Sequence, residues 1–431
     1  MREDPTDTPL QPRDANACAR ISLASRLLPK SATADAGWLI LTRALRALGD
    51  GAVSILLVSY LQGIGFSAFD VGAIVTGTLL GSAALTLLVG LVPHGVHPLR
   101  LLKAAAILML ATGMGFALAR SFWPLFAIAV IGTLNPSAGD VSVFLPMEQT
   151  LLSDTVRGAD RTLIFAWYNV CATFTGAIGA LLSALPAVVA RNHGWSRVSA
   201  ERMGFVGYAL LAVAVLAGYL RMSPAAETSL AGTARMPLAH SRAIVMRLSA
   251  LFSLDSFGGG FVVQSLLVLW LFHRFDLSPQ ATAAVFFAAG LLGGLSQFVS
   301  AWMAERIGLI NTMVFTHLPA NVFLVLAGVM PTARLAITFL LLRMLLSQMD
   351  VPARQSYVMA VVPPQERPAA ASVTNVPRSL ATALSPLLAG AMLNHSSFGW
   401  PLVCGGIVKA AYDLLLLMQF SAVKPHPESG R

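Results

Sequence analysis

The chain contains the series Asp140-Val141, Asp160-Arg161 and Asn169, and it repeats this series as Asp350-Val351, Glu366-Arg367 and Asn375. The aspartates are 210 positions apart (350 − 140), while the arginines and the asparagines are 206 apart (367 − 161 and 375 − 169). In each copy a long apolar stretch meets a charged loop, and the arginine precedes the asparagine by eight residues. A repeat over this distance indicates two related halves fused in tandem.

The composition around these repeats is too apolar for a soluble protein. Hydrophobic residues make up 56% of the 431 residues, charged residues make up 11%, and the mean hydropathy is +0.71. Soluble domains contain about 25% charged residues. Apolar runs of about 20 residues are long enough to cross a hydrocarbon layer of about 30 Å as helices. The runs predict twelve transmembrane helices, at 37–61, 69–92, 101–119, 122–145, 163–190, 204–222, 244–272, 281–304, 309–330, 335–359, 369–394 and 400–421.

The predicted helices fall into two groups of six, which agrees with the duplication. The expected fold is an all-α membrane protein with two pseudo-symmetric six-helix halves joined by a polar linker. The predicted organisation is a disordered cytoplasmic tail at 1–36, the first half at 37–222, the linker at 223–243, the second half at 244–421 and a second cytoplasmic tail at 422–431.

The basic residues predict an orientation in the membrane. Of the 29 lysines and arginines, 17 lie in segments that place both termini and the linker on one side, 6 lie in loops of the other side, and 6 lie within apolar segments. Because basic residues favour the cytoplasmic side, we expect a multi-pass protein of the cell membrane with both termini cytoplasmic. The net charge of +9 is therefore explained by topology, and we expect no nucleic-acid partner.

Two loop motifs resemble those of the major facilitator superfamily. The octapeptide from Ala301 to Gly308, AWMAERIG, matches the family's G-x-L-A-D-R-x-G loop at its Ala, acidic, Arg and last Gly positions. Pro363 to Arg367 resembles the family's P-x-x-x-R motif before the eleventh helix. The copy in the first half departs from the pattern, because His94 stands where the acidic residue belongs. The resemblance covers about residues 37 to 421 and implies a twelve-helix fold and solute transport, without naming a substrate.

Three charged residues lie on one face of the first predicted helix. Arg43, Arg46 and Asp50 are spaced at i, i+3 and i+7. An ionised side chain inside the bilayer costs several kcal/mol unless it pairs or lines a water-filled path. We interpret Asp50 as the protonatable carboxylate of a proton-coupled carrier, with Arg46 as its partner or as an anchor for an anionic substrate. The alternative is a static ion pair that holds the first helix to its neighbours.

A further candidate is Arg378, which lies beside Pro377 in the eleventh predicted helix. Helices broken by proline are tolerated in membranes where they line a cavity, and an arginine there can bind a carboxylate or phosphate with two nitrogens. It could equally neutralise Asp413 or Asp350. His317, near Pro319, is a second polar break, for which a hydrogen-bonded kink is favoured over a proton relay.

The repeated charges are candidates for a cytoplasmic gate. Asp140 and Asp350 are expected near the inner ends of the fourth and tenth helices, close in sequence to Arg161 and Arg367. Carboxylates and arginines that pair when the mouth closes would provide the bistable contact of an alternating-access carrier. Helix capping and topology are the alternative roles. The full set of gate candidates is Asp140, Glu148, Arg161, Glu305, Arg306, Asp350 and Arg367.

The sequence therefore favours a secondary transporter of a small organic solute, coupled to protons, with export favoured over import. We expect it to act as a monomer in the lipid bilayer, without a cofactor. The alternative is a carrier-like membrane sensor or scaffold that no longer transports. An enzyme is disfavoured because no nucleophile and base can be assembled, and His94-x-x-His97 lacks the companions of a metal site.

Overall fold

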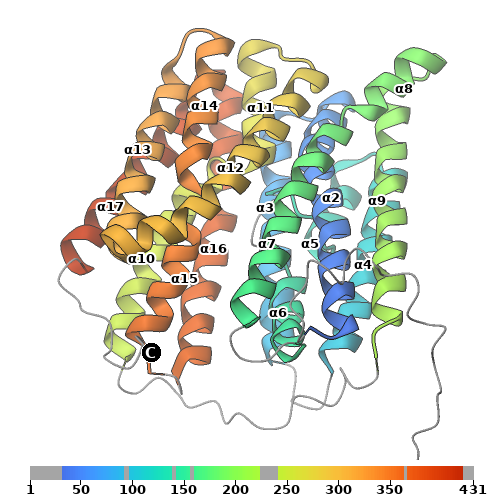
Figure 1. Ribbon diagram of the computed structural model, residues 1–431. Coiled ribbons are helices and arrows are strands. Elements are labelled where there is room, and N and C mark those ends of the chain that lie inside the picture. Colours follow the sequence, from blue (N-terminus) through green and yellow to red (C-terminus); the bar gives the residue numbers. More distant parts are fainter. Residues whose placement is uncertain are drawn as a thin grey trace, which may run out of the picture.

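The computed structural model describes residues 32–91, 97–137, 142–155, 160–223, 241–363 and 366–420. Within these ranges the regular structure is helical throughout (Figure 1). The first half consists of α2 (Ala34–Gly63), α3 (Ala68–Leu91), α4 (Pro98–Leu118), α5 (Phe122–Ile131), α6 (Phe144–Asp154), α7 (Asp160–Leu182), α8 (Leu185–His193) and α9 (Arg197–Leu220). The second half consists of α10 (Arg242–Gly260), α11 (Gln264–Phe275), α12 (Pro279–Ile307), α13 (Leu309–Val329), α14 (Ala333–Ser347), α15 (Asp350–Val361), α16 (Arg367–His395) and α17 (Trp400–Phe420).

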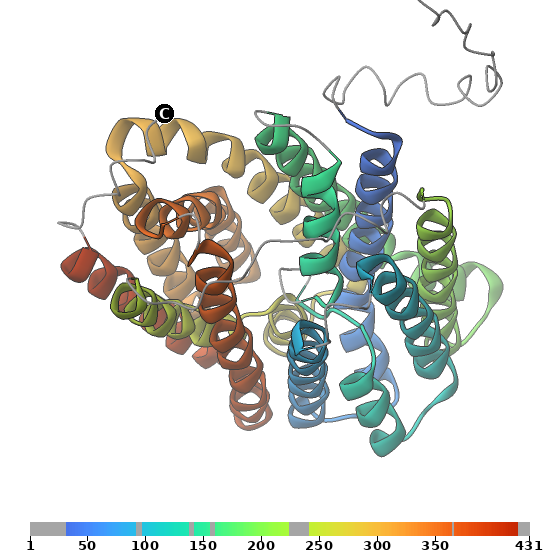
Figure 2. The same cartoon turned by 90° about the horizontal axis from the view of Figure 1, so that it is seen from below.

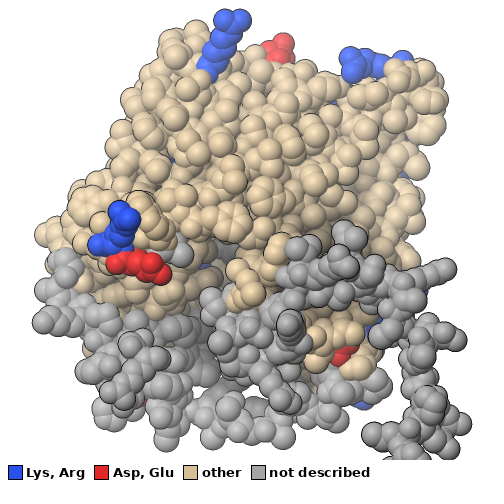
Figure 3. Space-filling model, in the orientation of Figure 1, with Lys and Arg blue, Asp and Glu red and all other residues tan. Residues whose placement is uncertain are grey.

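Eleven helical stretches of the described chain are long and apolar enough to cross a membrane, and the shorter α5 is apolar along its 10 residues. Together they correspond to the twelve predicted spans. The face of the molecule in Figure 3 has a wide band without lysine, arginine, aspartate or glutamate below its upper rim. Such a band fits the hydrocarbon layer, where a charged side chain is costly.

Four of the predicted spans are broken in two. The fourth ends as α5 shortly before Pro136, and the fifth is divided between α7 and α8, where Pro186 follows the break. The seventh is divided into α10 and α11 after the run Gly258–Gly260, and the tenth into α14 and α15 just before Pro352. Glycine and proline both weaken a helix, and broken helices persist in membranes where neighbouring protein satisfies the backbone.

The two halves form two bundles that lie side by side (Figures 1 and 2). In the first bundle α2 packs against α7 and α9, while α4 packs against α9. In the second, α10 packs against α16 and α17, while α13 packs against α14 and α17. The bundles meet mainly between α3 and α16, α7 and α12, and α2 and α11, with smaller contacts of α2 with α12 and of α3 with α11.

Small residues allow the bundles to approach closely. A Cβ atom added at Gly72 would lie 2.7 Å from the Pro386 carbonyl oxygen and 2.9 Å from the Gly390 Cα. The Ser265 hydroxyl donates to the carbonyl oxygens of Ser54 (2.7 Å) and Pro136 (2.9 Å). Close backbone packing and hydrogen bonds between helices are what hold membrane bundles together.

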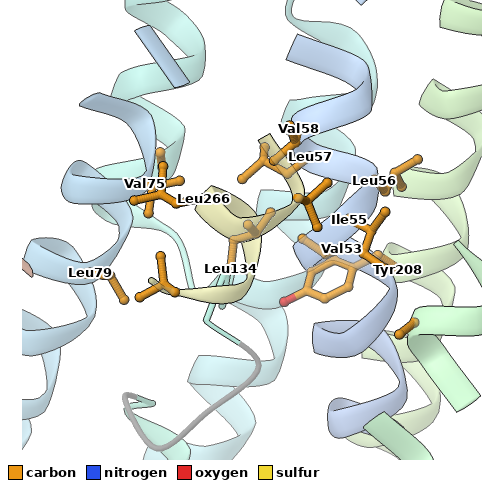
Figure 4. Packing of buried hydrophobic residues seen from close by; sticks show 14 of the residues in the cluster. Val53, Ile55, Leu56, Leu57, Val58, Val75, Leu79, Leu134, Tyr208 and Leu266 are labelled. Carbon is orange, nitrogen blue, oxygen red and sulfur yellow. The ribbon is translucent and has the colours of Figure 1, made fainter. Parts of the chain in front are cut away.

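The start of α11 belongs to the apolar core of the first half. Figure 4 shows Leu266 between α2 and α3, near Val75 and Leu134. Leu266 is 1% exposed, and Val75 and Leu134 are equally buried. Ser265 and Leu266 therefore anchor the second half to the first.

One short helix lies outside the bundles. α8 protrudes at the upper end of the molecule in Figure 1, and none of its residues is buried. It ends at Gly194, whose φ of 67° is in the left-handed region that favours glycine.

Candidate functional site

A buried ion pair joins the first and fourth spans of the first half. Arg46 of α2 is 1% exposed, Glu148 of α6 is 0% exposed, and the guanidinium donates to the carboxylate. The hydroxyl of Tyr168 donates to Glu148 Oε2 at 2.5 Å, and that of Tyr219 donates to Oε1 at 2.5 Å. The Arg46 guanidinium also stacks on the ring of Phe144, 4.2 Å from its centroid. Four helices, α2, α6, α7 and α9, thus converge on one carboxylate.

Two further charges of α2 lie beside this pair. Asp50 is 7% exposed, and its side-chain hydrogen bond is a long one, 3.4 Å from Asn135 Nδ2. Arg43 is 9% exposed, and its guanidinium lies 5.4 Å from the centroid of Tyr168. The Nε of Arg43 has no hydrogen-bond partner in the described chain. We call this set the N-terminal cluster, which comprises Arg43, Arg46, Asp50, Glu148, Tyr168 and Tyr219.

A second buried cluster occupies the other half. Asp255 of α10, 4% exposed, accepts hydrogen bonds from Arg354 of α15 at 3.2 Å and from Lys409 of α17 at 2.5 Å. Arg354 also pairs with Asp350, one helical turn earlier, at 3.3 Å. Two cations are therefore shared by two carboxylates away from water, a geometry that offsets part of the cost of burying each charge.

A histidine extends the second cluster. His317 Nδ1 lies 2.9 Å from Asp413 Oδ1, and Asn321 Nδ2 donates to Asp413 Oδ2 at 2.8 Å. The other ring nitrogen of His317 is 3.9 Å from Asp255 Oδ1. His317 is hydrogen-bonded, and its role as a helix kink, favoured from the sequence over a proton relay, stays a prediction. We call the set the C-terminal cluster, which comprises Asp255, His317, Asn321, Asp350, Arg354, Lys409 and Asp413.

Arg378 lies next to this cluster without joining its carboxylates. Its Nε donates to the Ser256 hydroxyl at 2.9 Å. The two carboxylates that the sequence suggested as partners are bonded to other groups, Asp350 to Arg354 and Asp413 to His317 and Asn321. Arg378 therefore adds a positive charge beside α10, one residue away from Asp255 in sequence at Ser256.

The gate candidates are dispersed. Glu148 and Asp350 belong to the two buried clusters, whereas Glu305 and Arg306 are exposed at the end of α12, with Arg306 stacked 4.2 Å from the Trp302 ring centroid. Arg161 is the second residue of α7 and Arg367 is the first residue of α16, but their side chains are outside the described part of the chain. Asp140 and His94 lie outside the described residues.

Sequence reasoning overlooked Asp255, and the duplication would have found it. Asp255 follows Asp50 by 205 positions (255 − 50), and Arg354 follows Glu148 by 206 (354 − 148). Both offsets lie within one residue of the 206 positions that separate the repeated arginines and asparagines. Tyr168 and Tyr219 carry no such signal, because a tyrosine in an apolar helix is unremarkable until its tertiary contacts are known.

Two six-helix bundles with buried charge clusters define a multi-pass membrane protein of the carrier type. The chain belongs to the Major Facilitator Superfamily, whose sequence model matches residues 39–347 and 250–431. It is also similar to the uncharacterized membrane protein YJR124C of Saccharomyces cerevisiae, with 22% identity over 416 residues that cover 88% of this chain and 92% of the relative.

Solved structures of transporters share the fold. A bacterial homolog of the human lysosomal transporter Spinster, in an inward-facing and occupied conformation, has a TM-score of 0.71 at 14% identity, covering 91% of this chain and 98% of its own. A D-xylose-proton symporter has a TM-score of 0.69 at 14% identity, with coverage of 91% and 98%. The nucleoside transporter NupG has a TM-score of 0.66 at 16% identity, with coverage of 90% and 99%. The twelve-helix fold of this superfamily is thus confirmed.

Proposed function

We propose that the protein is a proton-coupled secondary transporter of a small organic solute, which moves by alternating access between its two halves. Family and fold support transport as the general activity. The observation that carries the coupling is Asp50, a carboxylate buried at 7% exposure whose side-chain hydrogen bond is 3.4 Å long. A loosely held carboxylate inside a membrane is suited to gaining and losing a proton, whereas Glu148 is fixed by an arginine and two tyrosines.

The contacts between the halves suggest which side is open. The close approach of Gly72, near the start of α3, to Gly390, near the end of α16, lies toward the end of the molecule opposite the end of α9 and the start of α10. With the linker and both termini placed in the cytoplasm by the basic residues, this arrangement corresponds to an inward-facing carrier of the cell membrane. Outward opening would then need the linker-side ends of α6, α7, α15 and α16 to meet, where the gate candidates Arg161 and Arg367 lie in the first turns of their helices.

Reconstituted protein tests this function. In proteoliposomes with an imposed pH gradient and no membrane potential, we expect accumulation of at least one solute from a panel of labelled benzoate, nicotinate, D-xylose and uridine. Asp50→Asn should abolish accumulation and retain exchange of internal for external solute, because a permanently neutral side chain cannot release a proton. Asp276→Asn, which changes an exposed aspartate of the same chain, is the matched control.

Two outcomes would contradict the proposal. If Asp50→Asn still accumulates solute against a gradient, Asp50 is a structural residue and the coupling site lies elsewhere. If liposomes with the wild-type protein take up none of the panel faster than empty liposomes, the sensor or scaffold alternative replaces transport.

A further inference from the structure

Arg43 is the arginine of the N-terminal cluster that forms neither a hydrogen bond nor an ion pair in the described part of the chain, whereas Arg46 pairs with Glu148. It is nine-tenths buried, and in the described part of the chain it contacts the Tyr168 ring but forms no ion pair. Its buried Nε has no acceptor. Burying a guanidinium without an acceptor is costly, so such a group is expected to meet an anion at some stage of the working cycle.

The neighbours of Arg43 cannot supply that anion. Glu148 already accepts from Arg46, Tyr168 and Tyr219. Asp50 lies seven residues along α2, on the same face but about 10 Å away along the axis at 1.5 Å per residue. The charged and titratable groups that face Asp50 from its own and the packed helices are Arg43, Arg46, Glu148 of α6 and Tyr208 of α9, with Tyr168 of α7 facing Arg43 and Glu148.

We propose that the transported solute is a monocarboxylate whose carboxylate binds Arg43, and that it crosses together with one proton carried by Asp50. This inference rests on the proposed function and names the substrate class. The planar fork of arginine matches a carboxylate with two parallel hydrogen bonds, and the aromatic rings of Tyr168 and Phe144 supply apolar surface next to the two arginines.

The charge of the cluster explains why proton and anion travel together. Arg43 and Arg46 balance Asp50 and Glu148, so the empty cluster is neutral. A proton with a monocarboxylate leaves it neutral again. Either one alone leaves a net charge inside the membrane, which is costly and opposes the movement of the halves. The neutral forms are therefore the ones that reorient, and the solute and the proton cross in the same direction. The export favoured from the sequence stays a prediction.

The same count excludes more highly charged solutes. A phosphate monoester carries a charge of about −1.5 to −2 at neutral pH. Because the two arginines already balance Asp50 and Glu148, one proton would leave the loaded cluster with a net charge of about −0.5 to −1. A neutral solute such as a sugar would leave Arg43 without its acceptor. A carboxylate of charge −1 satisfies both the unpaired guanidinium and the neutrality of the loaded cluster.

Thermal unfolding of the purified protein in detergent measures binding without requiring transport. The probes are acetate, lactate, benzoate and nicotinate, with benzamide, nicotinamide and phenyl phosphate as matched comparisons. We expect at least one monocarboxylate to stabilise the protein, its amide to have no effect, and its affinity to fall between about tenfold and about a hundredfold in Arg43→Gln, the range for losing a charged hydrogen bond. Arg43→Lys should retain part of the affinity, because it keeps the charge but loses the planar fork.

Two further variants separate a binding role of Arg43 from a general effect of losing an arginine. Arg274 also has a buried Nε without a partner, but it donates to the Met330 carbonyl at 3.1 Å and stacks 5.0 Å from the Phe398 ring centroid. Arg274→Gln should therefore leave carboxylate affinity unchanged. Arg343 of α14 has an unpartnered Nε in the other half, and Arg343→Gln is expected to bind as the wild type does.

The pH dependence of carboxylate affinity tests whether the proton and the anion bind together. Wild-type affinity for the carboxylate should rise as pH falls from 7.5 to 5.5, because the proton on Asp50 and the anion bind together. Asp50→Asn should bind tightly at both pH values. The proposal is overturned if none of the four monocarboxylates stabilises the protein, if an amide or phenyl phosphate does so equally, or if affinity is unchanged in Arg43→Gln.

The two proposals fail in different ways. Arg43-dependent carboxylate binding without any pH-driven accumulation in liposomes would contradict coupling and leave the anion site standing. Asp50-dependent accumulation of D-xylose or uridine, with no carboxylate binding, would support the proposed function and reject the monocarboxylate.

Discussion

Each half carries a buried ion pair that ties its first helix to a later one, but the first-helix residues of the two pairs are not counterparts. Asp255 corresponds in the repeat to Asp50, which lies four residues after Arg46. In the first half the pair is Arg46 of the first span with Glu148 of the fourth, and in the second half it is Asp255 of the seventh span with Arg354 of the tenth. The surroundings also differ. Glu148 is completed by the neutral hydroxyls of Tyr168 and Tyr219, whereas the C-terminal cluster adds further ionic and imidazole groups, which are Lys409, Asp350, His317 and Asp413.

The difference indicates that the buried clusters of the two halves have different roles. A tie between the first and fourth helices of each half is served by either sign, so the tie itself is structural. In the second half each carboxylate bonds to charged or polar side chains of the cluster. In the first half Asp50 and Arg43 remain loosely held, and these two are the residues to which we assign proton and solute.

The largest expected effect is in the C-terminal cluster. Asp255→Asn leaves Arg354 and Lys409 without their shared carboxylate oxygen atoms, and breaking a buried ion pair from one side costs about 3–5 kcal/mol. We expect the apparent unfolding temperature in detergent to fall more than for any other single change below. Asp276→Asn, at an exposed position, should not change it. A stable Asp255→Asn protein would mean that Asp350 takes over both cations.

A smaller loss of stability is expected from Glu148→Gln. The amide keeps the shape of the carboxylate and still accepts from Tyr219, but the charged hydrogen bond from Arg46 is weakened, at a cost of about 1.5–3 kcal/mol. The double variant Arg46→Gln with Glu148→Gln should recover part of that loss, because no unpaired charge remains. A double variant that is less stable than the sum of the single changes would contradict a structural ion pair.

Removal of a single tyrosine hydroxyl tests how much its hydrogen bond to the buried Glu148 carboxylate stabilises the protein. Tyr219→Phe should cost about 1–2 kcal/mol, because a buried carboxylate loses one donor. The matched control is Tyr357→Phe, since the buried Tyr357 hydroxyl of the second half has no hydrogen-bond partner in the described chain. Loss of the Tyr357 hydroxyl should leave the free energy of unfolding unchanged or raise it slightly. Equal losses in both variants would assign the effect to packing.

The smallest effect on stability is expected from Asp350→Asn, below about 1 kcal/mol, because Arg354 keeps Asp255 at 3.2 Å. This makes the variant a clean test of the gate role predicted from the sequence. Spin labels at the linker-side ends of α6 and α15 should show a population shifted toward separation of these ends. An unchanged distance distribution would leave Asp350 as a secondary partner of Arg354.

The sequence predicted the fold because hydropathy and duplication are local signals. Hydropathy did not predict the breaks within four spans, because a run such as 244–272 stays apolar across the interruption at Gly258–Gly260. Grouping Arg43, Arg46 and Asp50 required only helical periodicity. The pairing of Arg46 with Glu148 joins residues 102 positions apart, and it depends on how α6 returns to α2 after the break at Pro136, which periodicity does not reveal. The gate roles remain a prediction.

The protruding α8 has a practical consequence for measuring the sidedness of the protein. A helix with no buried residue, ended by a glycine in the left-handed region, offers a short continuous epitope at the upper end of the molecule in Figure 1. An antibody fragment raised against 185–193 would label intact cells if this end is extracellular, and only permeabilised cells if it is not. Bound to the 45.4 kDa protein, the same fragment would also add the asymmetric mass that particle alignment in electron cryo-microscopy requires.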